Sequence, residues 1–86
     1  MEILKVSSKS NPNLVAGAIV NIAKEKGKVE LHSIGAGAIN QCVKSIAIAR
    51  GYIRPSDLDL ICVPSFLEVK VGDNTKTAIK MLVSIK

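Results

Sequence analysis

Short segments of alternating apolar and polar residues and longer segments with helical spacing follow one another along this chain of 86 residues. Because side chains of a strand point to opposite faces in turn, the alternation predicts strands over 2–7 and 28–34. In the second strand Val29, Leu31 and Ser33 share one face. The chain must therefore combine strands with helices.

Two helices are predicted, one after each of these strands. The first covers 12–26, where Asn11 can cap the helix start and Gly27 can end it. The second covers about 37–50 and should end at Gly51. The apolar stripe of this second helix is expected to consist of Ile39, Val43, Ile46 and Ala47.

The last third of the chain is expected to add two strands. Residues 58–63 are nearly all apolar, which is typical of a central strand covered on both faces. Pro64 should end or bulge that strand, and 66–71 should continue it. Gly72-Asp73-Asn74 predicts a hairpin turn into a final strand over 77–85.

The resulting order is β-α-β-α-β-β, which predicts an α+β fold: a two-layer α/β sandwich with both helices on one face of a four-stranded sheet. No linker or repeat divides the chain, so 1–86 are expected to form a single domain. Tyr52 and Phe66 are the only aromatic residues, so the core should be aliphatic. Apolar residues make up 48% of the chain, and we expect another subunit to cover part of them, including Ile48.

Basic residues exceed acidic ones by 12 to 7, and residues 1–54 carry the whole excess of +5. A basic half favours a polyanionic partner such as nucleic acid, with a solubilising surface as the alternative. No signal sequence or membrane-spanning apolar segment is present, so we expect a cytoplasmic protein with no membrane association. Cys42 and Cys62 should be free, packed thiols.

No set of residues in the sequence has the spacing of a catalytic or metal site. A zinc site needs about four clustered ligands, whereas only His32 and two separated cysteines are available. We expect His32 to be solvated or hydrogen-bonded in its strand. Asp57 and Asp59 lie where a loop enters a strand, and capping or solvation explains them better than catalysis. The sequence therefore predicts no enzyme, no metal and no cofactor.

Two segments could contact phosphate groups. The loop 8–11 opens the first helix with hydroxyls, a lysine and an amide, which suits phosphate contacts; a capping segment with an ordinary exposed lysine is the alternative. Gly35-Ala36-Gly37 stands between a strand and a helix, as phosphate-binding turns do, but Asn40 occupies the place of a third glycine. Close strand–helix packing explains these glycines equally well, and a nucleotide-binding module built on this turn is a further hypothesis.

The chain also resembles the stage V sporulation protein S family. The segments that carry the resemblance are EILKVSSKSNPNLVAGAI (2–19), IGAGAINQCVKSIAIARGYI (34–53), DLICVPSF (59–66) and TAIKMLVSI (77–85). That family is small, cytoplasmic and bacterial, and it is associated with control of spore development. In fold it resembles the Alba-type chromatin proteins, which share the β-α-β-α-β-β order, form dimers and bind DNA or RNA.

The resemblance implies a position for the nucleic acid. Lys9 matches the place where Alba lysines meet the backbone, and Gly37 and Gln41 stand where Alba proteins have basic residues on the second helix. We therefore expect a non-enzymatic regulatory protein, a homodimer or higher homo-oligomer, that contacts the phosphate backbone of DNA or RNA. The alternative is a protein-interaction adaptor in a developmental pathway without direct nucleic-acid binding. The predicted nucleic-acid surface consists of Ser8, Lys9, Ser10, Asn11, Gly35, Gly37, Asn40, Gln41 and Lys44.

Overall fold

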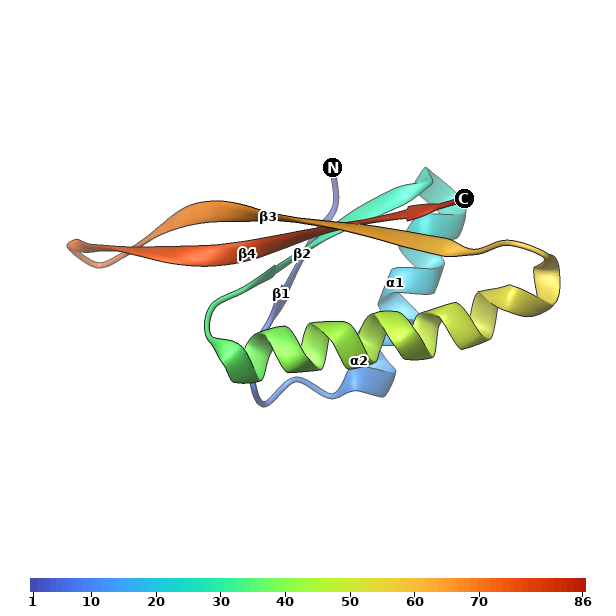
Figure 1. Ribbon diagram of the computed structural model, residues 1–86, viewed down its shortest axis with the longest axis horizontal. Coiled ribbons are helices and arrows are strands. Elements are labelled where there is room, and N and C mark those ends of the chain that lie inside the picture. The colour runs from blue at the N-terminus through green and yellow to red at the C-terminus, as the bar shows by residue number, and fades with distance from the viewer.

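The computed structural model describes residues 1–86 and contains the predicted elements in the predicted order (Figure 1). The strands are β1 (Ile3–Val6), β2 (Lys28–Ser33), β3 (Leu60–Val71) and β4 (Asn74–Ile85). The helices are α1 (Pro12–Lys26) and α2 (Ala36–Ile53), and a 3₁₀ turn, η1 (Arg54–Ser56), follows α2. No helix of the chain has the length and hydropathy needed to cross a membrane.

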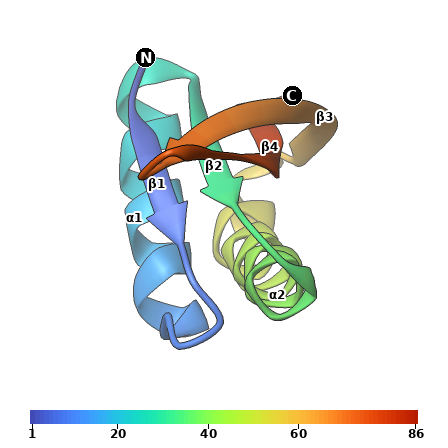
Figure 2. The ribbon, with the colours of Figure 1, turned by 90° about the vertical axis from the view of Figure 1, so that its left-hand side faces the viewer.

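The four strands form one sheet in the order β1-β2-β4-β3. β1 and β2 are parallel, whereas β4 runs antiparallel to both of its neighbours. Both helices lie on the same side of this sheet, as Figures 1 and 2 show. The predicted α+β, two-layer architecture is confirmed.

Helix α1 has the bounds that the sequence predicts, because both of its ends are marked by capping residues. Asn11 Oδ1 accepts hydrogen bonds from the N–H groups of Asn13 (2.9 Å) and Leu14 (3.4 Å). At the other end Gly27 adopts the left-handed conformation, with φ of 86°, and donates its N–H to the Ala23 carbonyl at 2.8 Å. The prediction for this helix is confirmed.

Helix α2 differs from the predicted helix in its end and in its buried face. It continues through Gly51 to Ile53, so the predicted end at residue 50 is wrong. A glycine inside a helix costs about 1 kcal/mol relative to alanine, which the full burial of Ile53 in the core can offset. The fully buried stripe consists of Ala38, Cys42, Ser45, Ala49 and Ile53. Of the predicted set, Ile39 and Ile46 pack against the core at its edge, whereas Val43 and Ala47 are exposed. Four of the five fully buried residues are small, so α2 can lie close to its neighbours.

Strand β3 lies at the edge of the sheet, so the prediction of a central strand is wrong. It also runs without a bulge through Pro64, which pairs with Met81. An edge strand tolerates proline, since every second N–H of such a strand points away from the sheet. The apolar residues Ile61 and Val63 therefore remain exposed on the face opposite the helices.

The β3–β4 hairpin extends beyond the rest of the sheet (Figure 1). β3 and β4 pair along their whole length, from Leu60 with Ile85 to Val71 with Asn74, around the predicted turn at Gly72. β2, in contrast, pairs with β4 only as far as Ile79. The distal half of the hairpin is thus a two-stranded arm.

The core between the layers is aliphatic, as predicted. Its largest fully buried apolar side chains are Ile19, Leu31, Ile53, Val29 and Val83. The two aromatic residues, Tyr52 and Phe66, are both exposed. Ile48 is partly buried and packs against the core, so it is not the exposed apolar side chain that the sequence predicts there.

Candidate functional site

The loop between β1 and α1 is held in shape by its own serines. Ser7 N–H donates to Ser10 Oγ at 2.9 Å, and Lys9 N–H donates to Ser7 Oγ at 3.2 Å. Ser10 N–H donates to the Ser7 carbonyl at 3.1 Å. These bonds occupy the hydroxyls of Ser7 and Ser10, and they leave the side chains of Ser8 and Lys9 exposed to solvent.

The same loop docks on the first turns of α2. Gln41 Nε2 donates to the Ser10 carbonyl oxygen at 2.8 Å. A Cβ atom at Gly37 would lie 3.0 Å from Ser8 Cβ, so any larger residue would push the loop away by a few tenths of an ångström. Gly35, the residue that opens the helix, has φ of 89°, a conformation that favours glycine. The structure thus brings the loop between β1 and α1 into contact with the start of α2, about 30 residues further along the chain. We refer to these two as the joined segments.

The predicted surface divides into exposed groups and groups that maintain the fold. Asn11 caps α1 and Gln41 tethers the loop, so these two side chains have structural roles. The alternative explanation of capping at Asn11 is confirmed. Close strand–helix packing does not explain the two glycines, because Gly37 approaches Ser8 of the loop and a Cβ at Gly35 would meet no atom within 4 Å. The residues whose side chains remain exposed around the joined segments are Ser8, Lys9, Asn40 and Lys44.

Asn40 and Lys44 lie four residues apart on α2, so their side chains share one side of the helix. The hairpin arm lies toward the same end of the molecule as the start of α2 (Figure 1). The arm contains two lysines, Lys70 and Lys76, and two acids, Glu68 and Asp73, so it adds no net charge. The positive charge near the joined segments therefore comes from the loop and from α2.

A row of basic residues that the sequence analysis did not find crosses the sheet face opposite the helices. Lys5 pairs with His32, and His32 pairs with Lys80 on the other side. His32 Nε2 lies 2.9 Å from Glu30 Oε1, which confirms the prediction of a hydrogen-bonded histidine. The His32 hydrogen bond is the main cause of the lowered pKa of Glu30, and Lys80 also contributes. The alternation of 2–7 and 28–34 signals outward-facing positions, but the register that aligns them is not visible in the sequence.

Neither cysteine has the environment of a reactive thiol. Cys42 is fully buried, and burial raises its pKa, although Ser33 acts in the opposite direction. Cys62 Sγ lies 3.4 Å from Met81 Sδ, and its pKa is raised first by burial and then by Cys42. A thiol with a raised pKa is a poor nucleophile at neutral pH.

The acidic residues that enter β3 stabilise a junction of the fold. Asp59 accepts hydrogen bonds from Arg50 Nε (2.6 Å) and Arg54 Nη1 (3.3 Å) and from the N–H of Leu60 (2.8 Å). Asp57, at φ of 62°, occupies the turn before it. The chain has no group of three or more His, Cys, Asp or Glu side chains arranged to hold a metal ion.

Comparison with known proteins identifies the fold and the family of this chain. The fold is similar to that of Alba from Thermoplasma volcanium, with a TM-score of 0.65, 15% sequence identity and coverage of 99% of each chain. At this identity the likeness establishes the Alba-like fold alone. A family model described as Stage V sporulation protein S matches residues 2–86. Because that match extends over nearly the whole sequence, this chain belongs to the stage V sporulation protein S family.

Proposed function

We propose that this chain is a non-enzymatic, dimeric regulatory protein of the cytoplasm that binds the phosphate backbone of DNA or RNA. The observation that carries the proposal is the docking of the Lys9 loop on the start of α2 through Gln41 and Gly37. This contact makes one surface from the two segments that the Alba resemblance assigns to the nucleic acid. Membership of the sporulation family supports a role in spore formation or a related process.

The start of α2 supports an anionic partner on physical grounds. Gly35 provides no side-chain cap, so the first N–H groups of this 18-residue helix have no side-chain acceptor. Such groups, together with the helix dipole, favour a phosphate. Lys9 in the loop and Lys44 on α2 add exposed positive charges near the helix start.

Binding through this surface should select weakly among sequences. Phosphate contacts fix a protein on its nucleic acid but do not read bases. Tyr52 lies in the last turn of α2, far along the helix from the joined segments, and Phe66 lies on β3. The surface itself therefore has no aromatic side chain on which a base could stack.

The dimer is supported by apolar side chains that the monomer leaves in water. Phe66 is 80% exposed on β3, and Val43 and Val63 are more than half exposed. A chain this small gains from covering such groups, because exposed apolar patches are typical of association surfaces. A second copy of the chain is the partner that we assign to them.

A protein-interaction adaptor is the second candidate. The observation that favours it is the charge balance of the hairpin arm, together with the absence of Lys and Arg from residues 35–43. An adaptor would use the same exposed surface for a protein partner. The two functions differ in their dependence on salt.

A salt series with single-stranded and double-stranded DNA and RNA tests the proposal. If Lys9 contacts one phosphate, Lys9→Ala should reduce the slope of log affinity against log salt by roughly one unit per site. Lys86→Ala is the matched control, because Lys86 lies at the C-terminus, away from the hairpin arm (Figure 1). Absence of salt-sensitive binding by the wild-type protein at low salt would leave the adaptor as the function. Binding with an unchanged slope in Lys9→Ala would mean that the surface has been misplaced.

A further inference from the structure

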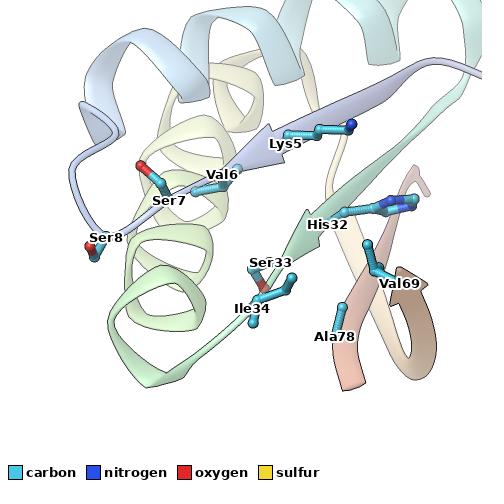
Figure 3. A pocket seen from close by; sticks show the side chains of 9 residues that line it. All are labelled: Lys5, Val6, Ser7, Ser8, His32, Ser33, Ile34, Val69 and Ala78. Carbon is cyan, nitrogen blue, oxygen red and sulfur yellow. The ribbon is translucent and has the colours of Figure 1, made fainter. Parts of the chain in front are cut away.

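A hollow of about 590 Å³ lies where β1 and β2 end and the hairpin arm leaves the sheet (Figure 3). Its volume is within the range of small-ligand sites in proteins. The carboxyl ends of adjacent parallel strands are also a common position for ligands in α/β sheets. Of its lining residues, only Ser8 belongs to the predicted nucleic-acid surface.

Basic groups dominate the side of the hollow that faces away from the helices. The side chains of Lys5 and His32 project from adjacent strands toward the same side (Figure 3). Lys80 follows His32 in the register, just outside the hollow. The carboxylate of this row is Glu30, which is held by His32 at 2.9 Å. The two lysines of this row outnumber its one acid, which favours an anionic ligand.

The remaining wall is apolar. It includes Ile34, which follows β2, and Val69 and Ala78 from the two strands of the arm. An inorganic anion would not use this wall, and a neutral apolar ligand would not use Lys5. A long acyl chain requires a channel lined by apolar residues, whereas only 4 of the 9 lining residues are hydrophobic. The lining therefore suits a small molecule that has apolar faces and carries an anionic group.

The His32 ring adds a preference for a flat ligand. Its hydrogen bond to Glu30 fixes the ring, and its side chain is only 17% exposed. An oriented imidazole can stack against a nucleobase, as aromatic rings do in proteins that bind unpaired bases. Ile34 and Val69 provide the accessible apolar surface beside it, and the buried Ala78 forms the floor.

We infer that this hollow binds one nucleotide unit, with the base against His32, Ile34 and Val69 and the phosphate at Lys5. The unit comes either from a free nucleotide or from a single-stranded nucleic acid. Ser8 lines the hollow and belongs to the loop that carries Lys9. A strand whose phosphates contact Lys9 would therefore pass the rim of the hollow. In its strand-bound form the inference rests on the proposed function, whereas binding of a free nucleotide does not.

Titration of the ¹⁵N-labelled full chain with adenosine 5′-monophosphate tests the inference. The nucleotide should shift the amide signals of His32, Ile34 and Ala78 and leave those of α1 unchanged. Adenosine alone and inorganic phosphate alone should each bind more weakly, because each engages only half of the lining. Absence of shifts at millimolar nucleotide would overturn the inference, and so would inorganic phosphate binding as tightly as the nucleotide.

Two variants locate the site. Ala78→Leu places a larger side chain in the hollow and should abolish binding, with the dispersion of the amide spectrum reporting whether the chain remains folded. Lys5→Gln changes an exposed residue and should weaken binding roughly two- to fivefold, the effect of one partly screened charge. Lys24→Gln removes the same charge from α1 and is the matched control. Equal affinity in Lys5→Gln and Lys24→Gln would contradict the assigned phosphate position.

Competition distinguishes the two sources of the nucleotide. A short single-stranded oligonucleotide that displaces adenosine 5′-monophosphate, and fails to do so in Ala78→Leu, identifies the strand as the ligand. Nucleotide binding without competition identifies a free nucleotide. Salt-dependent nucleic-acid binding without any nucleotide shift would reject the hollow and retain the proposed function, so the two failures can be told apart.

Discussion

Asp59 connects the end of α2 to the start of β3 through charged hydrogen bonds. Arg50 contacts both of its carboxylate oxygens, at 2.6 and 3.1 Å, and Arg54 adds a third bond at 3.3 Å. The hydrogen bond from Arg50, followed by that from the Leu60 N–H, holds the pKa of Asp59 well below its usual range. The same contact raises the pKa of Arg50. The ionised form of Asp59 is therefore favoured by folding.

Asp59→Asn should lower the stability of the protein at neutral pH and make it less sensitive to acid. Because the folded pKa is depressed, the stabilisation is complete above the unfolded pKa of about 3.9 and declines as the pH falls toward the folded value. Urea denaturation at pH 7 and near pH 2 measures both effects. The difference between wild type and variant should be smaller at the lower pH.

Asp57→Asn is the control for this comparison. Asp57 is exposed, and asparagine tolerates its left-handed backbone conformation. Its stability should follow that of the wild type at both pH values. Equal losses in the two variants would show that the Asp59 contacts do not stabilise the fold.

Among the elements, α1 could be predicted to the residue and α2 could not. Asn11 and Gly27 are specific end signals, and they act locally. The glycine at 51 resembles an end signal but lies inside α2, because burial of Ile53 depends on the rest of the fold. β3 shows the same limit, since apolar residues on both faces fit a central strand and an edge strand with exposed Ile61 equally well.

Because Gly51 lies inside α2, its replacement by alanine should stabilise the helix. A Cβ at this position would meet no other atom within 4 Å, so Gly51→Ala should raise the free energy of unfolding by about 0.5–1 kcal/mol. Thermal or urea denaturation measures the gain. The same substitution at Gly37 should bring no such gain, because the new methyl group would lie 3.0 Å from Ser8 Cβ. A loss of stability in Gly51→Ala would contradict the helical continuation described above.

The sequence predicts which segments form the candidate site, but it does not predict the contacts between them. The polarity of 8–11 and the glycines at 35 and 37 mark both segments in the sequence. The bond from Gln41 to Ser10 depends on how α2 lies against the loop, which no local pattern encodes. The hollow beside His32 depends likewise on the register of three strands.

For the molecule as a whole, assembly is the property most open to test. Phe66 is the most exposed large apolar side chain, at 80%, and Leu14 on α1 is nearly as exposed, at 74%. If β3 belongs to the dimer surface, Phe66→Ser should shift sedimentation from dimer toward monomer at micromolar concentration. Leu14→Ser should leave the dimer unchanged.

Sedimentation of the wild type and of these two variants tests separately whether the chain dimerises and which surface it uses. A wild-type protein that sediments only as a monomer would reject the dimer. Dissociation by Leu14→Ser but not by Phe66→Ser would move the surface to α1. Ile48 is unsuitable as a probe, because it packs against the core and its replacement by a charge would destabilise the monomer.

Pro64 limits how two copies of this chain could pair along the edge strand β3. The outer edge of β3 carries backbone groups with no partner strand, and the neighbouring residues Ile61, Val63 and Phe66 are apolar. Edges of this kind are templates for cross-β growth, in which each chain extends the sheet of the last. A proline in the middle of the edge removes one donor and interrupts the ladder that a further strand would need. In the proposed dimer, contacts between copies would then fall on side-chain faces, which can close into a finite pair rather than propagate into a fibre.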